Sequence, residues 1–213
     1  MKKIGLLIPK TNLTVEYELQ MLFSKGYFDI EKSVFYISKL DYKTNYEEDK
    51  SKFLEDLATD INNKKKDLKY LDVDYNVFFC TTSALENGVE EINPAISLIE
   101  ESKLRNVKKC LLITPYNDKL GKEIVKMLEN NEIEVIKNIN LDLLHTADYF
   151  NYGINKLEKL IKENYLNEYE NIIISCTNLP TISVIESLED RLNTQIISSN
   201  SSLFSKIKRD NNI

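Results

Sequence analysis

The chain carries the same short pattern twice, once in each half. Residues 2–9 read KKIGLLIP and residues 108–115 read KKCLLITP. A continuous apolar run that meets proline is typical of a strand buried on both faces of a sheet. Each run is followed by a helical pattern with a Met-Leu pair, at residues 21–22 and 127–128. The repetition predicts a duplicated α/β unit, joined near residues 105–107.

Other apolar runs alternate with segments of helical periodicity. The runs predict further strands at residues 34–37, 73–79, 132–136, 171–175 and 195–197. The periodicity predicts helices at residues 14–23, 49–69, 121–130, 153–164, 181–192 and 201–209. Residues 88–104 are predicted to be helical in large part, with a helix that starts near Asn93 because Pro94 is favoured in the first turn. Such alternation implies parallel sheets built from right-handed βαβ units. The predicted fold class is α/β, with two pseudo-symmetric Rossmann-like halves that each hold a small parallel sheet flanked by helices. We place the halves at residues 1–106 and 107–200, and we expect the C-terminal helix, 201–213, to pack back on the first half.

Composition excludes several classes of protein. A net charge of −6 argues against nucleic acid, which binds clustered Lys and Arg. No signal peptide and no apolar stretch of membrane-spanning length is present, so we expect a cytoplasmic protein without membrane partners. Three cysteines without CxxC spacing, together with one histidine, predict free thiols and no metal site. Five glycines form neither GxGxxG nor a Walker loop, so no nucleotide cofactor is expected.

Two of the cysteines follow strands in the same way. Cys80 ends the run VFFC and precedes Thr-Thr-Ser, and Cys176 ends IIISC and precedes Thr-Asn. A lone cysteine is most often a small buried hydrophobe. Ligands of parallel sheets, however, bind beyond the carboxyl ends of the strands, where both of these thiols are expected. A nearby helix N-terminus would also lower the pKa of a thiol. We therefore predict that Cys80 and Cys176 are catalytic and face one cleft, whereas Cys110, inside a strand, is structural.

Hydroxyl and amide groups near the two cysteines are candidates for binding an anion. Thr81, Thr82 and Ser83 offer hydroxyls and consecutive backbone N–H groups, which cradle carboxylate or enolate oxygens and also cap helices. Tyr116 and Asn12 follow the first strand of each half, where a side chain that faces the cleft would donate to a ligand. His145 has no partner visible in the sequence and is expected to be structural.

An ordered set of motifs resembles the aspartate/glutamate racemase superfamily, and within it the branch of maleate cis-trans isomerase and arylmalonate decarboxylase. The motifs are PKTN at residues 9–12 with Glu16, CTTS at 80–83, TPY at 114–116, SCTNL at 175–179 and SSN at 198–200. The resemblance implies an active site between the halves, no cofactor and a homodimer. It implies that the Cys80 thiolate adds to the double bond of a small carboxylic acid while the Cys176 thiol acts as acid. The substrate-binding residues that it implies are Asn12, Thr81, Thr82, Ser83, Tyr116, Thr177 and Asn178.

Three positions depart from the pattern of that branch. Lys10 replaces a small hydroxyl residue, Pro180 stands where many relatives carry arginine, and Tyr149 occupies the position of an asparagine ligand. These changes bear on the substrate more than on the fold. The favoured hypothesis is an isomerase that converts maleate to fumarate. An amino-acid racemase that moves protons with the same two thiols is the alternative, and a protein that binds a small acid without catalysis is a further one. The presence of both cysteines argues against a decarboxylase.

Overall fold

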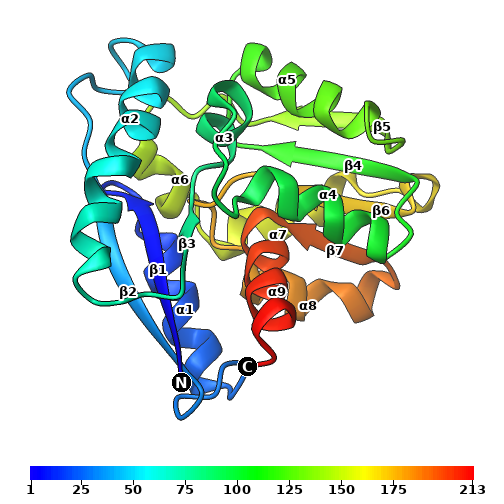
Figure 1. The fold of residues 1–213 in the computed structure, drawn as a ribbon. Helices are drawn as coiled ribbons and strands as arrows, with labels where there is room; N and C mark the ends of the chain where they lie inside the picture. Colours follow the sequence, from blue (N-terminus) through cyan, green and yellow to red (C-terminus); the bar gives the residue numbers. More distant parts are fainter.

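The computed structural model describes residues 1–213 and contains two parallel β-sheets (Figure 1). The first sheet has the strand order β2-β1-β3 and the second β5-β4-β6-β7. Every pairing is parallel, as the alternation of strands and helices predicts. The predicted α/β class with two small sheets is confirmed. The strands are β1 Lys2–Pro9, β2 Ser33–Leu40, β3 Tyr75–Phe78, β4 Lys109–Thr114, β5 Glu134–Asn140, β6 Asn171–Ile174 and β7 Gln195–Ser198.

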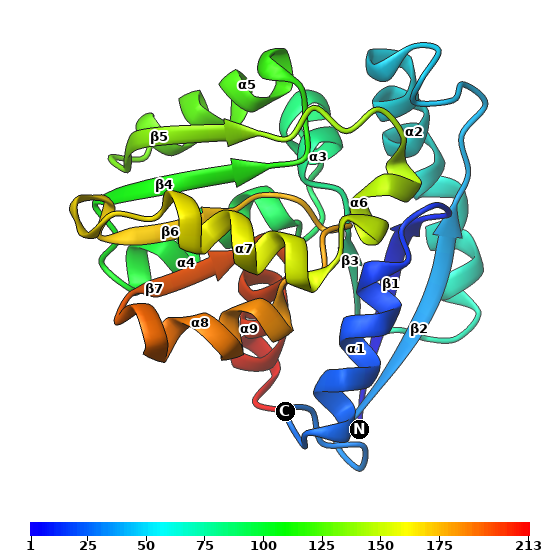
Figure 2. The same cartoon turned by 180° about the vertical axis from the view of Figure 1, so that it is seen from behind.

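Helices cover both faces of each sheet. In the first half, α1 and α2 lie on opposite faces of the sheet, and in the second half α7 and α8 lie on one face while α4 and α9 lie on the other (Figures 1 and 2). None of the helices combines the length and apolar character needed to cross a membrane. The helices are α1 Thr14–Ser24, α2 Lys50–Lys69, α3 Thr81–Asn87, α4 Pro94–Leu104, α5 Asp118–Glu129, α6 Thr146–Tyr152, α7 Ile154–Asn164, α8 Ile182–Leu192 and α9 Ser199–Asn211, with a 3₁₀ turn at Asn167–Tyr169.

The predicted helix start near Asn93 is confirmed, and a separate helix precedes it. The Asn93 side chain accepts hydrogen bonds from the N–H groups of Ala95 and Ile96, and Pro94 occupies the first turn, so α4 begins there. Residues 81–87 form α3, which ends at Gly88 in the left-handed region with φ 59°. Thr81, Thr82 and Ser83 therefore form the first turn of a helix directly after Cys80. The short helix α6 was likewise not predicted.

The C-terminal helix contacts elements that are distant in the sequence. Helix α9 packs against α4, and the ring of Phe204 lies 6.0 Å from Phe28 and 5.7 Å from Phe79, measured between ring centroids. Both of these partners precede residue 106. Helix α4 in turn contacts β7 of the second sheet. The division of the chain at residues 106 and 107 stays a prediction.

Candidate active site

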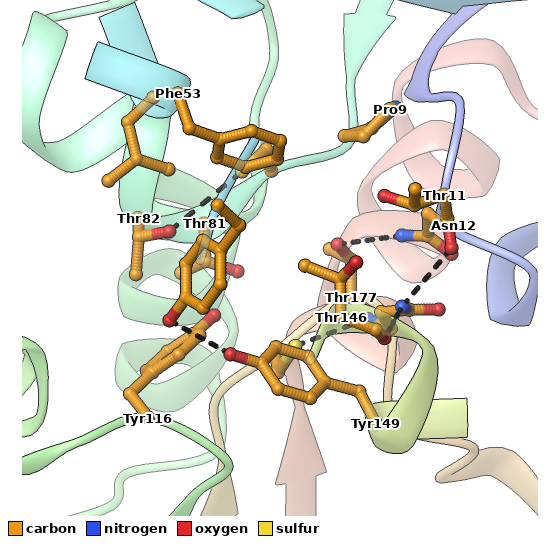
Figure 3. Close-up of a pocket in the computed structure, with 15 residues that line it drawn as sticks. Pro9, Thr11, Asn12, Phe53, Thr81, Thr82, Tyr116, Thr146, Tyr149 and Thr177 are labelled. Carbon is orange, nitrogen blue, oxygen red and sulfur yellow. Dashed lines mark hydrogen bonds between the residues drawn. The ribbon is translucent and has the colours of Figure 1, made fainter. Parts of the chain in front are cut away.

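A small pocket lies between the two sheets, at the ends of β1, β3, β4 and β6. Its cavity volume is about 50 Å³. Asn12 and Thr177 lie on one side of it and Thr82 and Tyr116 on the other (Figure 3). Every predicted site residue except Ser83 lines it, so residues far apart in the sequence meet where parallel strands end. The lining residues are Pro9, Thr11, Asn12, Tyr46, Phe53, Leu54, Cys80, Thr81, Thr82, Tyr116, Thr146, Tyr149, Cys176, Thr177 and Asn178.

Cys80 is the N-cap residue of α3 and is half-buried. Burial raises the pKa of its thiol, and hydrogen bonds from the Ser83 N–H, the Thr82 hydroxyl and the Thr82 N–H oppose that rise. The Thr82 hydroxyl oxygen is 3.9 Å from the sulfur. The prediction that the helix N-terminus lowers this pKa is wrong in its net direction, because the loss of water outweighs the donors of the first turn. The donors are nevertheless aimed at the sulfur.

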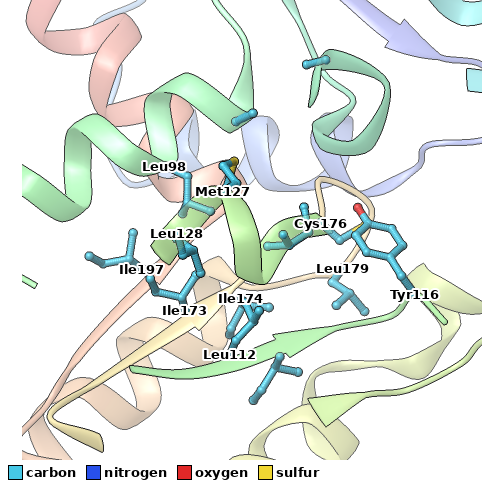
Figure 4. Packing of buried hydrophobic residues seen from close by; sticks show 14 of the residues in the cluster. Leu98, Leu112, Tyr116, Met127, Leu128, Ile173, Ile174, Cys176, Leu179 and Ile197 are labelled. Atoms are coloured by element: carbon cyan, nitrogen blue, oxygen red, sulfur yellow. The ribbon is translucent and has the colours of Figure 1, made fainter. Parts of the chain in front are cut away.

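Cys176 follows β6 and is buried against the apolar core. Figure 4 shows it beside Tyr116 and Leu179, at the edge of the hydrophobic cluster. Burial raises the pKa of its thiol to about 12, and hydrogen bonds from the Tyr116 hydroxyl and from the Asn178 N–H act in the opposite direction. The Asn178 nitrogen is 3.3 Å from the sulfur. The Cys80 thiol also raises the pKa of Cys176, so the two groups lie close enough to influence each other's ionisation.

The third cysteine and one predicted hydroxyl lie outside the pocket. Cys110 is fully buried within β4, as its place in an apolar run predicts. The Ser83 hydroxyl donates to the Leu54 carbonyl at 2.7 Å and does not line the pocket, and the contact of Ser83 with substrate stays a prediction. Its backbone N–H alone points toward the site, at Cys80. Thr81 lines the pocket, but its hydroxyl pairs with the Ser199 hydroxyl at 3.1 Å.

Asn12 and Thr177 connect the two halves beside the pocket. The Asn12 amide donates to the Thr177 hydroxyl at 3.1 Å, and that hydroxyl donates to the Phe79 carbonyl at 3.0 Å. The Asn12 side-chain oxygen accepts from the Val15 N–H in the first turn of α1. One N–H of the Asn12 amide is left for a ligand, because a primary amide has two. Asn12 therefore combines a structural contact with a free donor at the pocket wall.

Both the oxygen and the nitrogen of the Asn178 side chain are engaged in hydrogen bonds within the protein. Its side-chain oxygen accepts from the Leu13 N–H at 3.1 Å and from the Thr14 hydroxyl at 3.2 Å, at the start of α1. Its amide nitrogen donates to the Thr146 carbonyl at 2.8 Å and reaches the Thr11 carbonyl at 3.5 Å. These contacts fix the Cys176 turn to the loop after β1. In this structure Asn178 serves to position loops, rather than offering the free carboxylate donor that the resemblance implies.

Two further tyrosines, Tyr46 and Tyr149, close the pocket. Tyr46 lies between β2 and α2, Tyr149 lies on α6, and the Tyr149 hydroxyl donates to the Tyr46 hydroxyl at 2.9 Å. The rings of Tyr116 and Tyr149 pack edge to face, with centroids 6.2 Å apart. Sequence reasoning missed Tyr46 as a site residue, because a single tyrosine among twelve carries no distinguishing signal.

No charged side chain lines the pocket. Lys10 is turned away from it, with its ammonium 3.3 Å from Asp41 and 4.0 Å from the centre of the Tyr42 ring. His145, expected to have no partner, is exposed at the start of α6 with Nδ1 3.2 Å from a carboxylate oxygen of Glu47. An anion in this pocket would therefore be held through N–H and O–H donors rather than through an ion pair.

Comparison with known proteins agrees with the resemblance in the sequence. A family model described as arylmalonate decarboxylase matches residues 90–210, which is more than half of the chain. A maleate isomerase of Alcaligenes faecalis is 25% identical over 92% of this chain and 85% of its own length. The solved maleate isomerase Iso of Pseudomonas putida S16 has a TM-score of 0.85 at 18% identity, covering 100% of this chain and 93% of that one.

A second solved structure extends the match of fold. It is the maleate cis-trans isomerase of Nocardia farcinica, in a cysteine-to-serine variant with a covalently bound succinylcysteine intermediate. The two folds agree with a TM-score of 0.84 at 16% identity, over 98% of this chain and 91% of that one. The curated and solved relatives named here are enzymes. The chain belongs to the arylmalonate decarboxylase family, in the maleate isomerase branch of the aspartate/glutamate racemase superfamily.

Proposed function

We propose that the protein is a cofactor-independent cis-trans isomerase of a small dicarboxylic acid, and that it converts maleate to fumarate. The observation that carries this proposal is the pair of thiols, Cys80 and Cys176, in one small pocket whose other polar groups are all uncharged. Each thiol comes from a different half of the molecule. A flat alkene between them would present one face to each sulfur.

The proposed reaction begins with addition of the Cys80 thiolate to one alkene carbon. The π electrons move to the neighbouring carbon and its carboxylate, and the Cys176 thiol gives that carbon its proton. The former double bond of the substrate is now a single bond, and the two halves of the substrate rotate about it. The Cys176 thiolate then removes the proton again, the double bond re-forms, and Cys80 leaves as thiolate. Bonds and protons balance without a co-reactant.

The surroundings of the two sulfurs support these roles. Donors from the first turn of α3 point at Cys80, and the Tyr116 hydroxyl and Asn178 N–H favour the thiolate of Cys176. The raised pKa of each thiol keeps both groups mostly protonated in the empty site at neutral pH, so the fraction of Cys80 present as thiolate grows as pH rises. A covalent succinylcysteine has been captured in the Nocardia farcinica relative, which is the adduct expected from addition of a cysteine to maleate.

The uncharged lining also favours the isomerase over the racemase. An amino-acid substrate brings an ammonium group, whose burial is costly without an anion beside it. No Asp or Glu lines the pocket. A carboxylate, in contrast, is stabilised by the N–H and O–H groups that the lining does provide. The pocket therefore favours a diacid. Homodimerisation and a cytoplasmic location stay predictions.

The test is incubation of the protein with maleate in D₂O, followed by proton NMR. The proposal expects fumarate from the parent protein, and none above background from Cys80→Ser or Cys176→Ser assayed separately. Cys110→Ser is the matched control, since that thiol lies outside the pocket. A panel with aspartate, glutamate and phenylmalonate runs in parallel. Deuterium at Cα of an amino acid would favour the racemase, and loss of CO₂ a decarboxylase. Tight binding of diacids without turnover would favour the binding protein.

A further inference from the structure

Glu18 is a carboxylate buried in the protein interior. Its side chain lies on α1, is 1% exposed and makes no ion pair. One oxygen accepts from the Thr181 N–H, from the Ile182 N–H at 2.8 Å and from the Thr181 hydroxyl at 3.3 Å, at the start of α8. The other accepts from the Asn200 amide at 2.6 Å. Burial of an unpaired carboxylate costs free energy, so its presence calls for an explanation.

Asn200 connects Glu18 to the site. Its amide nitrogen donates to Glu18 and also to the Thr177 carbonyl at 3.0 Å, whereas its side-chain oxygen is buried without a partner. The amide is therefore oriented with both of its N–H groups in use. A carboxylate accepts hydrogen bonds only, so the ionised Glu18 favours this orientation. If the amide turned over, its oxygen would face the Thr177 carbonyl and that contact would be lost.

The Thr177 carbonyl belongs to the same peptide unit as the Asn178 N–H. A trans peptide is planar, and its C=O and N–H point in opposite directions. Asn200 holds the carbonyl end at 3.0 Å, and the N–H end lies 3.3 Å from the sulfur of Cys176. Fixing one end of the unit therefore aims the other end at the thiol. This donor is one of those that favour the Cys176 thiolate.

We propose that Glu18 is a positioning residue for Cys176. The ionised Glu18 side chain fixes the orientation of the Asn200 amide, and that amide in turn orients the peptide whose N–H donates to the Cys176 sulfur. The expected effect on kcat rests on the proposed function. The link from Glu18 through Asn200 to the Asn178 N–H rests on the geometry alone. A protonated Glu18 presents an O–H, which turns the Asn200 amide and releases the Thr177 carbonyl.

The setting of Glu18 makes it sensitive to pH in the neutral range. Burial raises the pKa of this carboxyl to about 7, and its hydrogen bonds act in the opposite direction. The nearby charges of α1 and α8 are taken up by surface partners: Glu16 is 2.6 Å from Lys39, and Glu186 pairs with Lys25. Helix α9 faces it with Asn200, which does not titrate. The groups that hydrogen-bond to Glu18 itself, from Thr181, Ile182 and Asn200, do not titrate in this range.

The test compares Glu18→Gln with the parent enzyme across pH, with maleate as substrate. Glutamine donates toward Asn200 at every pH and so mimics the protonated acid. The ratio of parent to variant kcat is expected to be near one at about pH 5.5 and to rise to roughly tenfold above pH 8. A tenfold ratio corresponds to the free energy that one buried hydrogen bond contributes. Titration of Cys80 cancels in this ratio. Asn200→Ala cuts the same link and is expected to give the same curve, while Glu186→Gln, on the exposed pair between the same helices, is expected to give a ratio of one throughout.

A ratio for Glu18→Gln that does not change with pH would overturn the proposal. If the protein does not turn over maleate, the proposed function fails on its own, and hydrogen exchange of the Asn178 amide decides the inference. At pH 8 the parent and Glu186→Gln are expected to exchange this amide at the same rate, and Glu18→Gln and Asn200→Ala roughly tenfold faster. Equal exchange in all four proteins would refute the link.

Discussion

Replacing Glu18 with glutamine is expected to stabilise the protein at alkaline pH, although the same change slows the enzyme. The ordinary pKa of this carboxyl is 4.5 and burial raises it to about 7 in the folded state. Between these values the folded protein holds a proton that the unfolded chain has released, so stability falls as pH rises and levels off above about pH 7. This difference between the folded and unfolded pKa lowers the unfolding free energy by about 3 kcal/mol above pH 7. Glutamine carries no charge and avoids this loss.

Urea unfolding of the parent and of Glu18→Gln, monitored by circular dichroism, measures the effect. Because the unfolded chain has already released part of its proton at pH 5, the unfolding free energy of the variant is expected to gain about 2.5 kcal/mol relative to the parent between pH 5 and pH 8.5. Glutamine also places an uncharged amide among the N–H donors that surround residue 18, at a cost that does not depend on pH. Subtracting the variant-minus-parent values at the two pH values removes this cost. Glu186→Gln is exposed and serves as the control. A difference in unfolding free energy that is the same at both pH values would refute the assignment of Glu18 as the titrating group.

Three further predictions concern the pocket and the core. Turnover of maleate by Glu18→Gln, in which residue 18 does not titrate, is expected to rise about tenfold per pH unit between about pH 6 and pH 8, because the thiolate fraction of Cys80 grows by that factor below its raised pKa; a flat profile in steady-state assays would contradict the role of this thiol. Tyr149→Phe removes the hydroxyl that donates to Tyr46, and is expected to cost about 1 kcal/mol in urea unfolding and to raise KM; unchanged stability would mean that the two phenols do not pair in solution. Cys110→Ala is expected to lose roughly 1–2 kcal/mol of stability through a core cavity while kcat stays unchanged, and a fall in kcat would place this thiol in the mechanism.

Opposite effects of one substitution on stability and on rate are informative about the role of Glu18. A residue that only held the fold together would lower both when removed. A buried carboxylate that costs stability yet aims a donor at a reacting thiol is the pattern expected of a functional site, where local strain is tolerated.

The sequence by itself determined the fold class and the two thiols. Continuous apolar runs separated by helical periods have one stable solution, parallel sheets covered by helices, and parallel strands present their carboxyl ends on one edge. Cys80 and Cys176 are therefore placed by local pattern alone, and Cys110 is excluded by the same pattern. The same reasoning places Tyr116, Asn12 and Thr82 at this edge, because each lies just beyond the end of a strand in the sequence.

Only the tertiary structure decided which polar groups are free and which are already engaged. Ser83 and Asn178 look like ligand donors in the sequence, but their side chains are used by Leu54 and by the loop after β1. Tyr46 and Glu18 carry no signal in the sequence because their roles depend on partners more than a hundred residues away, Tyr149 and Asn200. The direction of the thiol pKa shifts also needed the structure, since desolvation depends on everything packed around the sulfur. Local pattern fixes where a strand ends, whereas hydrogen-bond partners and burial are properties of the whole fold.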